Sequence, residues 1–400
     1  MERTKKILIC GAGIAGPTCG WWLHKYGFSV VIVEKADAFR DGGQNVDVKG
    51  AGQQVIKGMN LVEQVEARNT QERGQKWLDA SGKLVARFPR GAFGSLTSDF
   101  EILRGDFARV LFDATSSTCE YRFGIYVIDI EEMGTGVKTT FSDGSTEEFE
   151  LVIGADGLSS STRDLALAQE TQMRYLGAYM AFFKIPRRAE DDLWACSVNG
   201  VGGTMINLRP GGPMETTVLI TFAASKPDSQ RQPILSRRDM LLSALKGRGT
   251  IADRIISELD GVKDFYFGPM SQVQASTWSK GRLVLLGDAA YCPTPFTGKG
   301  TALALVGAYV LAGEINRCST YNQAFQEYER ILRPYAERSQ QELSPRFISL
   351  MHLQTRFGIA VARIVQRFFG SAMIQALLRS SAASRARKVN EDFALPVYPY

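Results

Sequence analysis

The sequence predicts an α/β protein in which a mostly parallel sheet is interleaved with an antiparallel sheet and followed by a C-terminal helical segment. Near the start of the chain, a strand-like apolar run leads into a glycine turn and a helix. Two later buried-type strands end in aspartate, and a β-rich stretch with glycine-rich and proline-rich turns separates them. The chain has 400 residues, of which 44% are hydrophobic and 22% charged, so it can form two or three cores and is neither disordered nor fibrous.

Composition excludes several classes of function. No apolar stretch approaches the roughly 20 residues of a membrane-spanning helix, and the first apolar run, Ile7–Cys10, is too short for the core of a signal peptide. We therefore expect a soluble, cytoplasmic protein. The six cysteines lie far apart without a Cys-x-x-Cys pair, which argues against a disulfide framework and a thiolate metal site. His24 and His352 are the only histidines, which disfavours histidine metal sites and Ser-His-Asp chemistry.

The net charge of +5 is concentrated near the C-terminus. Between Ser344 and Asn390 the chain carries eight basic residues and no acidic residue, so the remainder is slightly negative. The main body therefore gives no support to nucleic-acid binding.

A glycine turn between a strand and a helix is the strongest local signal. Lys5–Cys10 is an apolar, β-prone run, the turn follows it, and residues 17–26 have the character of a helix. In such a turn Gly11 permits the tight bend, Gly13 lets backbone N–H groups approach a pyrophosphate, and Gly16 lets the helix pack closely on the strand. The helix N-terminus adds partial positive charge. A glycine-rich turn without a ligand is the alternative for the turn taken alone.

The next strand supports dinucleotide binding. Ser29–Val33 is apolar and ends in Glu34, a residue type that accepts hydrogen bonds from an adenosine ribose at this place. The turn itself is compatible with both NAD and FAD.

Two aspartate-bearing strand ends favour FAD over NAD. Leu151–Gly154 is a buried-type strand that leads to Asp156-Gly157, and a second such strand leads to Gly287-Asp288. Because ligands of parallel sheets lie outside the carboxyl ends of the strands, both aspartates should face one crevice. Ordinary turn chemistry could explain either aspartate alone, because Asp-Gly is common in turns.

With these three motifs the sequence resembles the single-component, class A FAD-dependent monooxygenases of the para-hydroxybenzoate hydroxylase type. Gly42–Gly50 is also similar to the stretch that passes over the flavin in tetracycline-inactivating monooxygenases. The resemblance implies a Rossmann-type FAD-binding domain, with Glu34 on the ribose, Asp288 on the ribityl chain, and Arg40 and Arg104 near FAD. The residues expected to bind cofactor are Gly11, Gly13, Ala15, Gly16, Glu34, Lys35, Arg40, Arg104, Asp156, Gly157, Gly287, Asp288, Pro295, Gly298, Lys299 and Gly300.

The sequence departs from the family pattern at two positions. Many members have His where this chain has Tyr291, and Asn where it has Ala302. These departures put details of flavin contact and nicotinamide use in doubt.

The apolar run at residues 301–315 is expected to form a buried helix behind a proline- and glycine-rich turn. The resemblance implies that its N-terminus points at the pyrimidine edge of the flavin, where the helix dipole favours the anionic reduced form. Lys299 could add to this effect, or it could be merely solvated.

The resemblance also implies a reaction. Since the sequence has one nucleotide-binding turn, NADPH or NADH would bind transiently, reduce FAD and leave O2 to form a C4a-hydroperoxyflavin that oxygenates the substrate. No catalytic side chain is assigned, because the flavin performs the chemistry. Two alternatives stay open. A flavin halogenase is one, although the Trp-x-Trp-x-Ile segment of tryptophan-type halogenases is absent from the sequence. A cyclase or other non-redox protein that keeps FAD for structure is the other.

The domains are expected to interleave. Residues 1–74, 98–172 and 270–335 would form the FAD-binding domain, residues 75–97 and 173–269 an antiparallel-sheet substrate domain, and residues 336–400 a C-terminal helical segment. Hairpins are predicted around Gly82 and Gly144. The expected substrate is a small apolar, aromatic or polyketide-like molecule, by family analogy alone. Its candidate contacts are Phe296 and, more speculatively, Met205, Asn207 and Phe222.

The tail repeats apolar residues at helical spacing among its basic residues. We expect a helix that lies on the other two domains, with binding to an anionic membrane surface as the alternative. The sequence does not reveal the oligomeric state.

Overall fold

The computed structural model describes residues 5–39, 43–92, 100–224, 234–262, 265–294, 297–376, 378 and 393–399. Among these residues no helix is both long and apolar enough to cross a membrane.

The first sheet has the strand order β17-β18-β11-β1-β2-β7 and is parallel except for the β17–β18 pair. Its strands are β1 (Lys6–Cys10), β2 (Ser29–Glu34), β7 (Glu120–Phe123), β11 (Leu151–Gly154), β17 (Ser279–Lys280) and β18 (Leu283–Leu285). The central strands are continuous aliphatic runs because both faces of the sheet are covered. Strand β1 lies between β2 and β11, so the glycine turn leaves the middle of the sheet.

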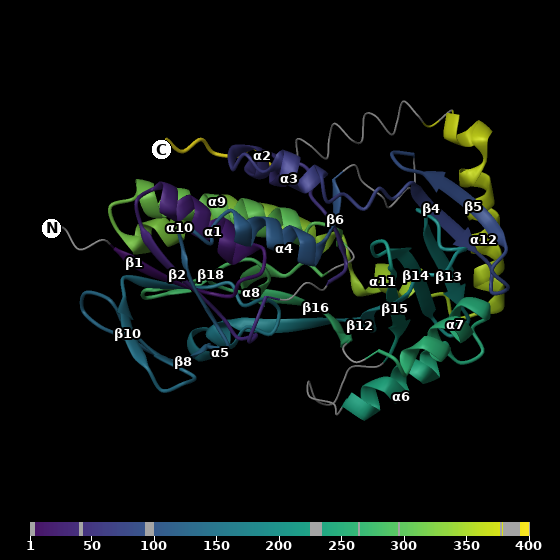
Figure 1. Cartoon of the computed structure of the whole chain (residues 1–400), viewed down its shortest axis with the longest axis horizontal. Coiled ribbons are helices and arrows are strands. Elements are labelled where there is room, and N and C mark those ends of the chain that lie inside the picture. Colours follow the sequence, from purple (N-terminus) through teal and green to yellow (C-terminus); the bar gives the residue numbers. More distant parts are fainter. Residues whose placement is uncertain are drawn as a thin grey trace.

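Helices cover this sheet and form the left half of the molecule in Figure 1. They are α1 (Ala15–Lys25), α2 (Ala51–Gly58), α3 (Val62–Glu66), α4 (Arg104–Asp113), α5 (Ser161–Ala166), α8 (Asp288–Tyr291), α9 (Gly300–Arg317) and α10 (Tyr321–Gln341). Helix α9 is buried along nearly its whole length and packs against α1, α2 and α10. The same half includes the small sheet of β8 (Val127–Glu132), β9 (Val137–Phe141) and β10 (Thr146–Phe149). A separate two-stranded pair is formed by β3 (Asn45–Asp47) and β6 (Glu101–Leu103).

The second sheet has the order β16-β12-β15-β14-β13-β4-β5. Its strands are β4 (Gly74–Leu78), β5 (Leu84–Pro89), β12 (Thr171–Pro186), β13 (Ala195–Gly200), β14 (Thr204–Pro210), β15 (Glu215–Ala223) and β16 (Tyr266–Ala275). The long strands β12 and β16 connect the two halves of the molecule (Figure 1). One face packs against α6 (Ile234–Leu245) and α7 (Thr250–Leu259), where Leu241 and Leu245 are buried with Ile255.

The predicted fold class is confirmed, including the interleaved order of the two parts and the C-terminal helices. Both hairpins are present, as β4–β5 and β9–β10. The second sheet is antiparallel except where β4 runs parallel to β13. The exact domain bounds stay a prediction.

In the described part of the tail lie the helices α11 (Pro345–Met351) and α12 (Arg356–Gly370), each with its own side-chain cap. Ser344 Oγ accepts a hydrogen bond from Phe347 N at 3.2 Å, and Thr355 Oγ1 accepts one from Gly358 N at 3.0 Å. Helix α11 packs on β12, and α12 packs on β5 at the far end of the second sheet (Figure 1).

Candidate active site

The glycine turn is shaped by close backbone contacts on two of its three glycines. Gly11 has a φ of +111°, and a Cβ atom there would lie 2.5 Å from the Ala155 carbonyl oxygen. A Cβ atom on Gly16 would collide with the Gly11 carbonyl oxygen, so the close packing of α1 on β1 requires glycine. Gly13 differs, because the nearest described atom to its Cβ position is Arg104 Nη2 at 3.5 Å. The turn is therefore open at the residue where a pyrophosphate would approach.

Glu34 lies beside this turn at the end of β2. Its Oε2 accepts a hydrogen bond from Ala12 N at 3.0 Å, and its Oε1 accepts one from Ala36 N at 3.0 Å. These bonds fix the carboxylate and leave lone pairs that can accept from a ribose hydroxyl. Lys35, the next residue, is exposed, and its ammonium lies 4.8 Å from the centre of the Tyr126 ring. The side chain of Lys35 is thus directed toward Tyr126, and its contact with the cofactor stays a prediction.

Asp288 and Arg104 come together at the same crevice. The Gly287 Cβ position lies 3.1 Å from Ala15 Cβ, which places the turn before α8 against the start of α1. Asp288 is partly accessible to solvent, but many protein atoms lie around its carboxylate. The loss of hydration raises the pKa of Asp288, and the positive charge of Arg104 opposes this rise. The crevice therefore joins the glycine turn, a cation and a carboxylate that lie far apart in the sequence.

The N-terminus of α9 closes another side of the crevice. A Cβ atom on Gly300 would lie 3.9 Å from Asp288 Oδ1, and one on Gly298, where φ is +63°, would lie 3.7 Å from Asp47 Oδ2. The Lys299 ammonium forms an ion pair with Glu342, just beyond α10. The positive end of the α9 dipole therefore faces Asp288, while the Lys299 charge is paired with a carboxylate. The candidates Arg40, Pro295 and Phe296 lie outside the described residues.

Asp156 has a local structural role. Its Oδ2 accepts hydrogen bonds from Thr162 N and Thr162 Oγ1, both at 3.0 Å, and the Ser160 hydroxyl donates to Oδ1. The carboxylate therefore ties the turn to the start of α5, next to Gly157 with its φ of +82°. Cofactor contact by Asp156 and Gly157 stays a prediction.

The two departures from the family pattern lie in the core. The Tyr291 hydroxyl is 3.0 Å from that of Tyr328, and a Cβ atom on Gly307 of α9 would collide with it. Ala302 lies against α2, with its Cα 3.1 Å from the Gly52 Cβ position. Both side chains therefore pack between helices in the core.

The faces of the second sheet separate the candidate substrate residues. Met205 and Asn207 are nearly buried on one face of β14, together with Arg209. Phe222 lies on the opposite face of β15, where its ring stacks on Tyr179 in the core under α6 and α7. The strand alternation therefore directs the Phe222 ring away from the face that meets the first half, and its contact with substrate stays a prediction.

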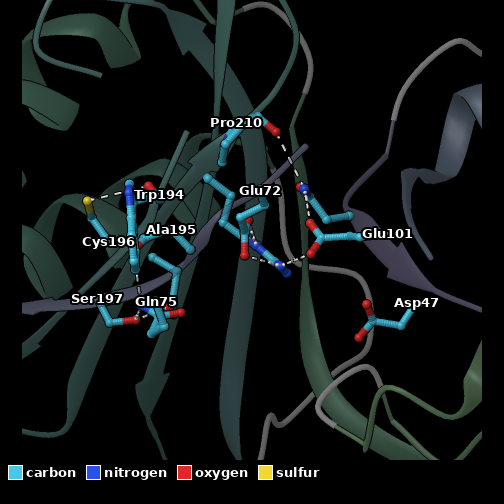
Figure 2. Close-up of polar contacts among 12 residues, drawn as sticks. Asp47, Glu72, Gln75, Glu101, Trp194, Ala195, Cys196, Ser197 and Pro210 are labelled. Atoms are coloured by element: carbon cyan, nitrogen blue, oxygen red, sulfur yellow. Dashed lines mark hydrogen bonds and ion pairs between the residues drawn. The ribbon is translucent and has the colours of Figure 1, made fainter. Parts of the chain in front are cut away.

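A short relay of hydrogen bonds orients Asn207. Gln75 Nε2 donates to Ser197 Oγ at 2.8 Å (Figure 2). The Ser197 hydroxyl in turn donates to Asn207 Oδ1. No hydrogen bond from Asn207 Nδ2 is found within the described residues, so this amide group is available to donate. Met205 pairs with Thr221, whose hydroxyl hydrogen-bonds the ring of His352 after α11, so this side chain lies deeper under the tail.

A buried charge cluster joins the two halves beside this face. Arg209 contacts Glu72 through Nε at 2.9 Å and Nη2 at 3.0 Å, and contacts Glu101 Oε2 at 2.8 Å (Figure 2). Asn45 Nδ2 donates to Glu101 Oε1 at 2.6 Å and approaches the Pro210 carbonyl oxygen at 3.4 Å. Burial raises the pKa of the Glu101 carboxyl to about 7, although Arg209 opposes the rise.

This buried cluster was not predicted from the sequence. Its members come from β6, β14 and the segment before β4, and no spacing marks them as partners. Through these contacts the face of β14 that carries Asn207 lies toward β3. Strand β3 belongs to the stretch Gly42–Gly50, which is expected to pass over the flavin.

Comparison with known proteins supports the same cofactor. A family model described as an FAD binding domain matches residues 4–342. A flavin-dependent monooxygenase from an unknown prokaryotic organism is 35% identical over 353 residues, covering 85% of this chain and 88% of the relative. The FAD-dependent monooxygenase asL6 of Sarocladium schorii is 32% identical over 425 residues and covers 99% of this chain and 98% of its own.

The crystal structure of the tetracycline destructase Tet(55) superposes with a TM-score of 0.85 at 29% identity, covering all of both chains. The open glycine turn, Glu34 beside it and the α9 N-terminus over the crevice fit an FAD, in agreement with these relatives. The chain belongs to the family of class A FAD-dependent monooxygenases.

Proposed function

We propose that this enzyme uses NADPH or NADH and O2 to hydroxylate, epoxidise or otherwise oxygenate a small apolar, aromatic or polyketide-like molecule. The observation that carries the proposal is the meeting of two surfaces. Arg209, Glu101 and Asn45 hold the Asn207 face of the second sheet against the β3–β6 pair, and the Gly298 Cβ position before α9 lies 3.7 Å from Asp47 Oδ2 of β3. A substrate bound on that face would lie next to the flavin.

The side chains of the crevice would hold FAD and polarise it. Bound FAD supplies hydride acceptance from the nicotinamide, reaction with O2 and delivery of one oxygen atom to a substrate carbon. Gly13 would leave room for the pyrophosphate, and Glu34 would accept from the ribose. Asp288 would accept from the ribityl chain, while the N-terminus of α9 would favour negative charge on the nearby edge of the ring.

The chemistry of the proposed substrate face fits a mostly apolar molecule with a polar group. Asn207 offers a fixed amide donor, and Leu219 of β15 lies opposite it in the strand register. A donor held by neighbouring hydrogen bonds orients a carbonyl or hydroxyl without losing side-chain entropy on binding. One structural relative is named for tetracycline, which agrees with a sizeable ring system as substrate.

The experiment is to mix the purified holoenzyme with NADPH, isotopically labelled O2 and candidate aromatic substrates. We expect substrate-stimulated NADPH oxidation and one labelled oxygen atom in the product. Incorporation of chloride would instead identify a halogenase, and conversion without NADPH would identify a non-redox enzyme. Either result would overturn the proposal.

A further inference from the structure

Helix α12 presents a continuous apolar stripe to solvent. Its members recur at the spacing i, i+4, i+7, i+8, i+11, which places them on one face of a helix. They are Phe357, Val361, Ile364, Val365 and Phe368, with exposed fractions of 79%, 43%, 66%, 48% and 56%. A surface helix ordinarily turns such a stripe toward the core, so its exposure indicates a partner.

The opposite face of α12 is already used for packing. Ile359 is 5% exposed, and Phe369 packs on the small cluster of Val85, Ala86 and Phe88 at β5. The Gly370 Cβ position lies 2.9 Å from Ala86 Cβ, so the helix is in close contact with the sheet there. The helix is thus anchored to the edge of the second sheet (Figure 1), and its stripe lies on the outer side.

A row of arginines runs beside the stripe. Arg356, Arg363 and Arg367 recur at i, i+7 and i+11 and therefore lie along one flank of the helix, between the stripe and the packed face. Arg356 and Arg367 are exposed, and neither has an ion pair within the described residues. No acidic residue occurs between Ser344 and Asn390, so the tail brings no negative charge of its own. Asp79, between β4 and β5, is near enough to Arg363 for the two charges to interact, whereas Arg356 and Arg367 stay exposed without such a partner among the described residues.

The charge distinguishes between possible occupants of the stripe. A second copy of the chain would bring two rows of arginines together, and like charges destabilise such a contact. An anionic lipid surface attracts the arginines and takes up the aromatic and aliphatic side chains at the boundary of headgroups and acyl chains. At 15 residues the helix is too short to span a bilayer, which needs roughly 20, so it would lie in the plane of the surface.

We propose that α12 binds this enzyme to the surface of an anionic membrane through the stripe Phe357–Phe368 and its flanking arginines. The arginine stems extend along the apolar layer while the guanidinium groups reach the phosphates. The second sheet would then lie beside a phase in which apolar small molecules concentrate. The proposal does not depend on the reaction that the enzyme performs.

The test is cosedimentation of the holoenzyme with vesicles of phosphatidylcholine alone or mixed with phosphatidylglycerol. We expect binding to the anionic vesicles, weaker binding in high salt, and little binding to the neutral vesicles. Combining Phe357→Ser, Ile364→Ser and Phe368→Ser should weaken binding by roughly tenfold or more, because three anchoring side chains are lost. The pair Arg356→Gln and Arg367→Gln should weaken binding to anionic vesicles and reduce its salt dependence.

Matched controls come from exposed residues elsewhere. Met214→Ser removes an apolar side chain that is 79% exposed, and Lys57→Gln removes an exposed charge on α2; neither should change vesicle binding. All variants should keep their flavin content and their NADPH oxidation rate without vesicles. Failure of the parent to bind anionic vesicles overturns the proposal. So does a concentration-dependent dimer in ultracentrifugation that the triple serine variant abolishes, because the stripe is then an interface between copies.

Discussion

Gly13 is the residue at which packing and cofactor binding can be separated. Its φ is not positive, and a Cβ atom would lie 3.5 Å from Arg104 Nη2, so alanine fits the protein itself. Alanine should therefore leave the apoprotein as stable as the parent or more stable by up to about 1 kcal/mol. The methyl group would occupy the approach of the pyrophosphate, and we expect Gly13→Ala to weaken FAD binding by roughly tenfold or more.

Titration by flavin fluorescence measures this affinity, and urea unfolding of the apoprotein measures the stability. Gly134→Ala in the β8–β9 hairpin, where a Cβ meets no atom within 4 Å, is the matched control. Unchanged FAD affinity in Gly13→Ala would show that the turn does not hold the pyrophosphate.

Glu101 should make the stability of the protein depend on pH. The folded protein holds the Glu101 proton up to a pKa of about 7, whereas the unfolded chain releases it near the ordinary 4.5. The unfolded state therefore binds fewer protons between these values, and raising the pH through this window disfavours folding. In Glu101→Gln this loss is absent, so the free energy of unfolding of the variant relative to the parent should increase between about pH 4.5 and about pH 7.

Urea unfolding across this range measures the difference, with the exposed Glu66→Gln as the control. A constant difference between Glu101→Gln and the parent would mean that folding does not raise the pKa of this carboxyl. Glu72 and Asp47 raise the Glu101 pKa further, so the effect belongs to the cluster and not to one isolated group.

At the scale of elements, Tyr291 and Gly307 should act as one packing unit between α8 and α9. Gly307→Ala places a methyl group on the Tyr291 hydroxyl and should cost about 1–3 kcal/mol of unfolding free energy. Tyr291→Phe removes the contact with the Tyr328 hydroxyl and should cost about 0.5–1.5 kcal/mol. In the double variant the collision is gone, so the two costs should not add, with a coupling of about 0.5–3 kcal/mol.

A double-mutant cycle by urea unfolding measures this coupling. Flavin content should stay at the parent level in Tyr291→Phe, because this hydroxyl faces the core. Additive costs would mean that the α8–α9 contact relaxes without strain.

His352 fastens the segment after α11 to the second sheet, and it should do so in a pH-dependent way. Its Nδ1 lies 2.7 Å from the Ile348 carbonyl oxygen, and its Nε2 lies 3.0 Å from Thr221 Oγ1. Burial lowers the pKa of this imidazole from its ordinary 6.5. As the pH falls, the imidazole therefore takes up a proton in the unfolded chain before it does so in the folded protein. The contribution of His352 to the free energy of unfolding is present above about pH 6.5 and is lost as the pH falls below this value.

In His352→Gln this loss is missing, so the advantage of the parent over the variant should shrink from about pH 7.5 to about pH 5.5. Thermal unfolding at the two pH values measures it, with the exposed His24→Gln as the control. An advantage that is equal at both values would assign His352 a packing role without titration.

At the scale of the whole molecule, local patterns predicted the strands and turns, whereas contacts across the chain were not predictable. The glycine turn, Asp288 and both hairpins have sequence signals because a turn imposes its chemistry on neighbouring residues. Strand alternation does not say which face of β15 meets the first half, and Phe222 lies on the face that packs under α6 and α7. The Arg209–Glu72 pair spans 137 positions, and no spacing encodes such a contact.

Helix boundaries show the same limit. Helices α6 and α7 are separate although apolar residues recur at helical spacing in both, because Gly247 and Gly249 adopt φ values of +71° and +103° between them. The tail likewise divides at Ser344 and Thr355, which cap α11 and α12. These glycines and caps are visible in the sequence, but tertiary packing decides whether the chain uses them.

The visible spectrum of the purified protein shows directly whether each chain binds one FAD. The purified protein, supplied with FAD and freed of excess, should show the visible absorption bands of oxidised flavin at one equivalent per chain. Gly13→Ala should hold less flavin under the same conditions, and the Gly134→Ala control should match the parent. A colourless protein that takes up no FAD would contradict the convergence of the glycine turn, Arg104, Asp288 and the α9 N-terminus on a single cofactor.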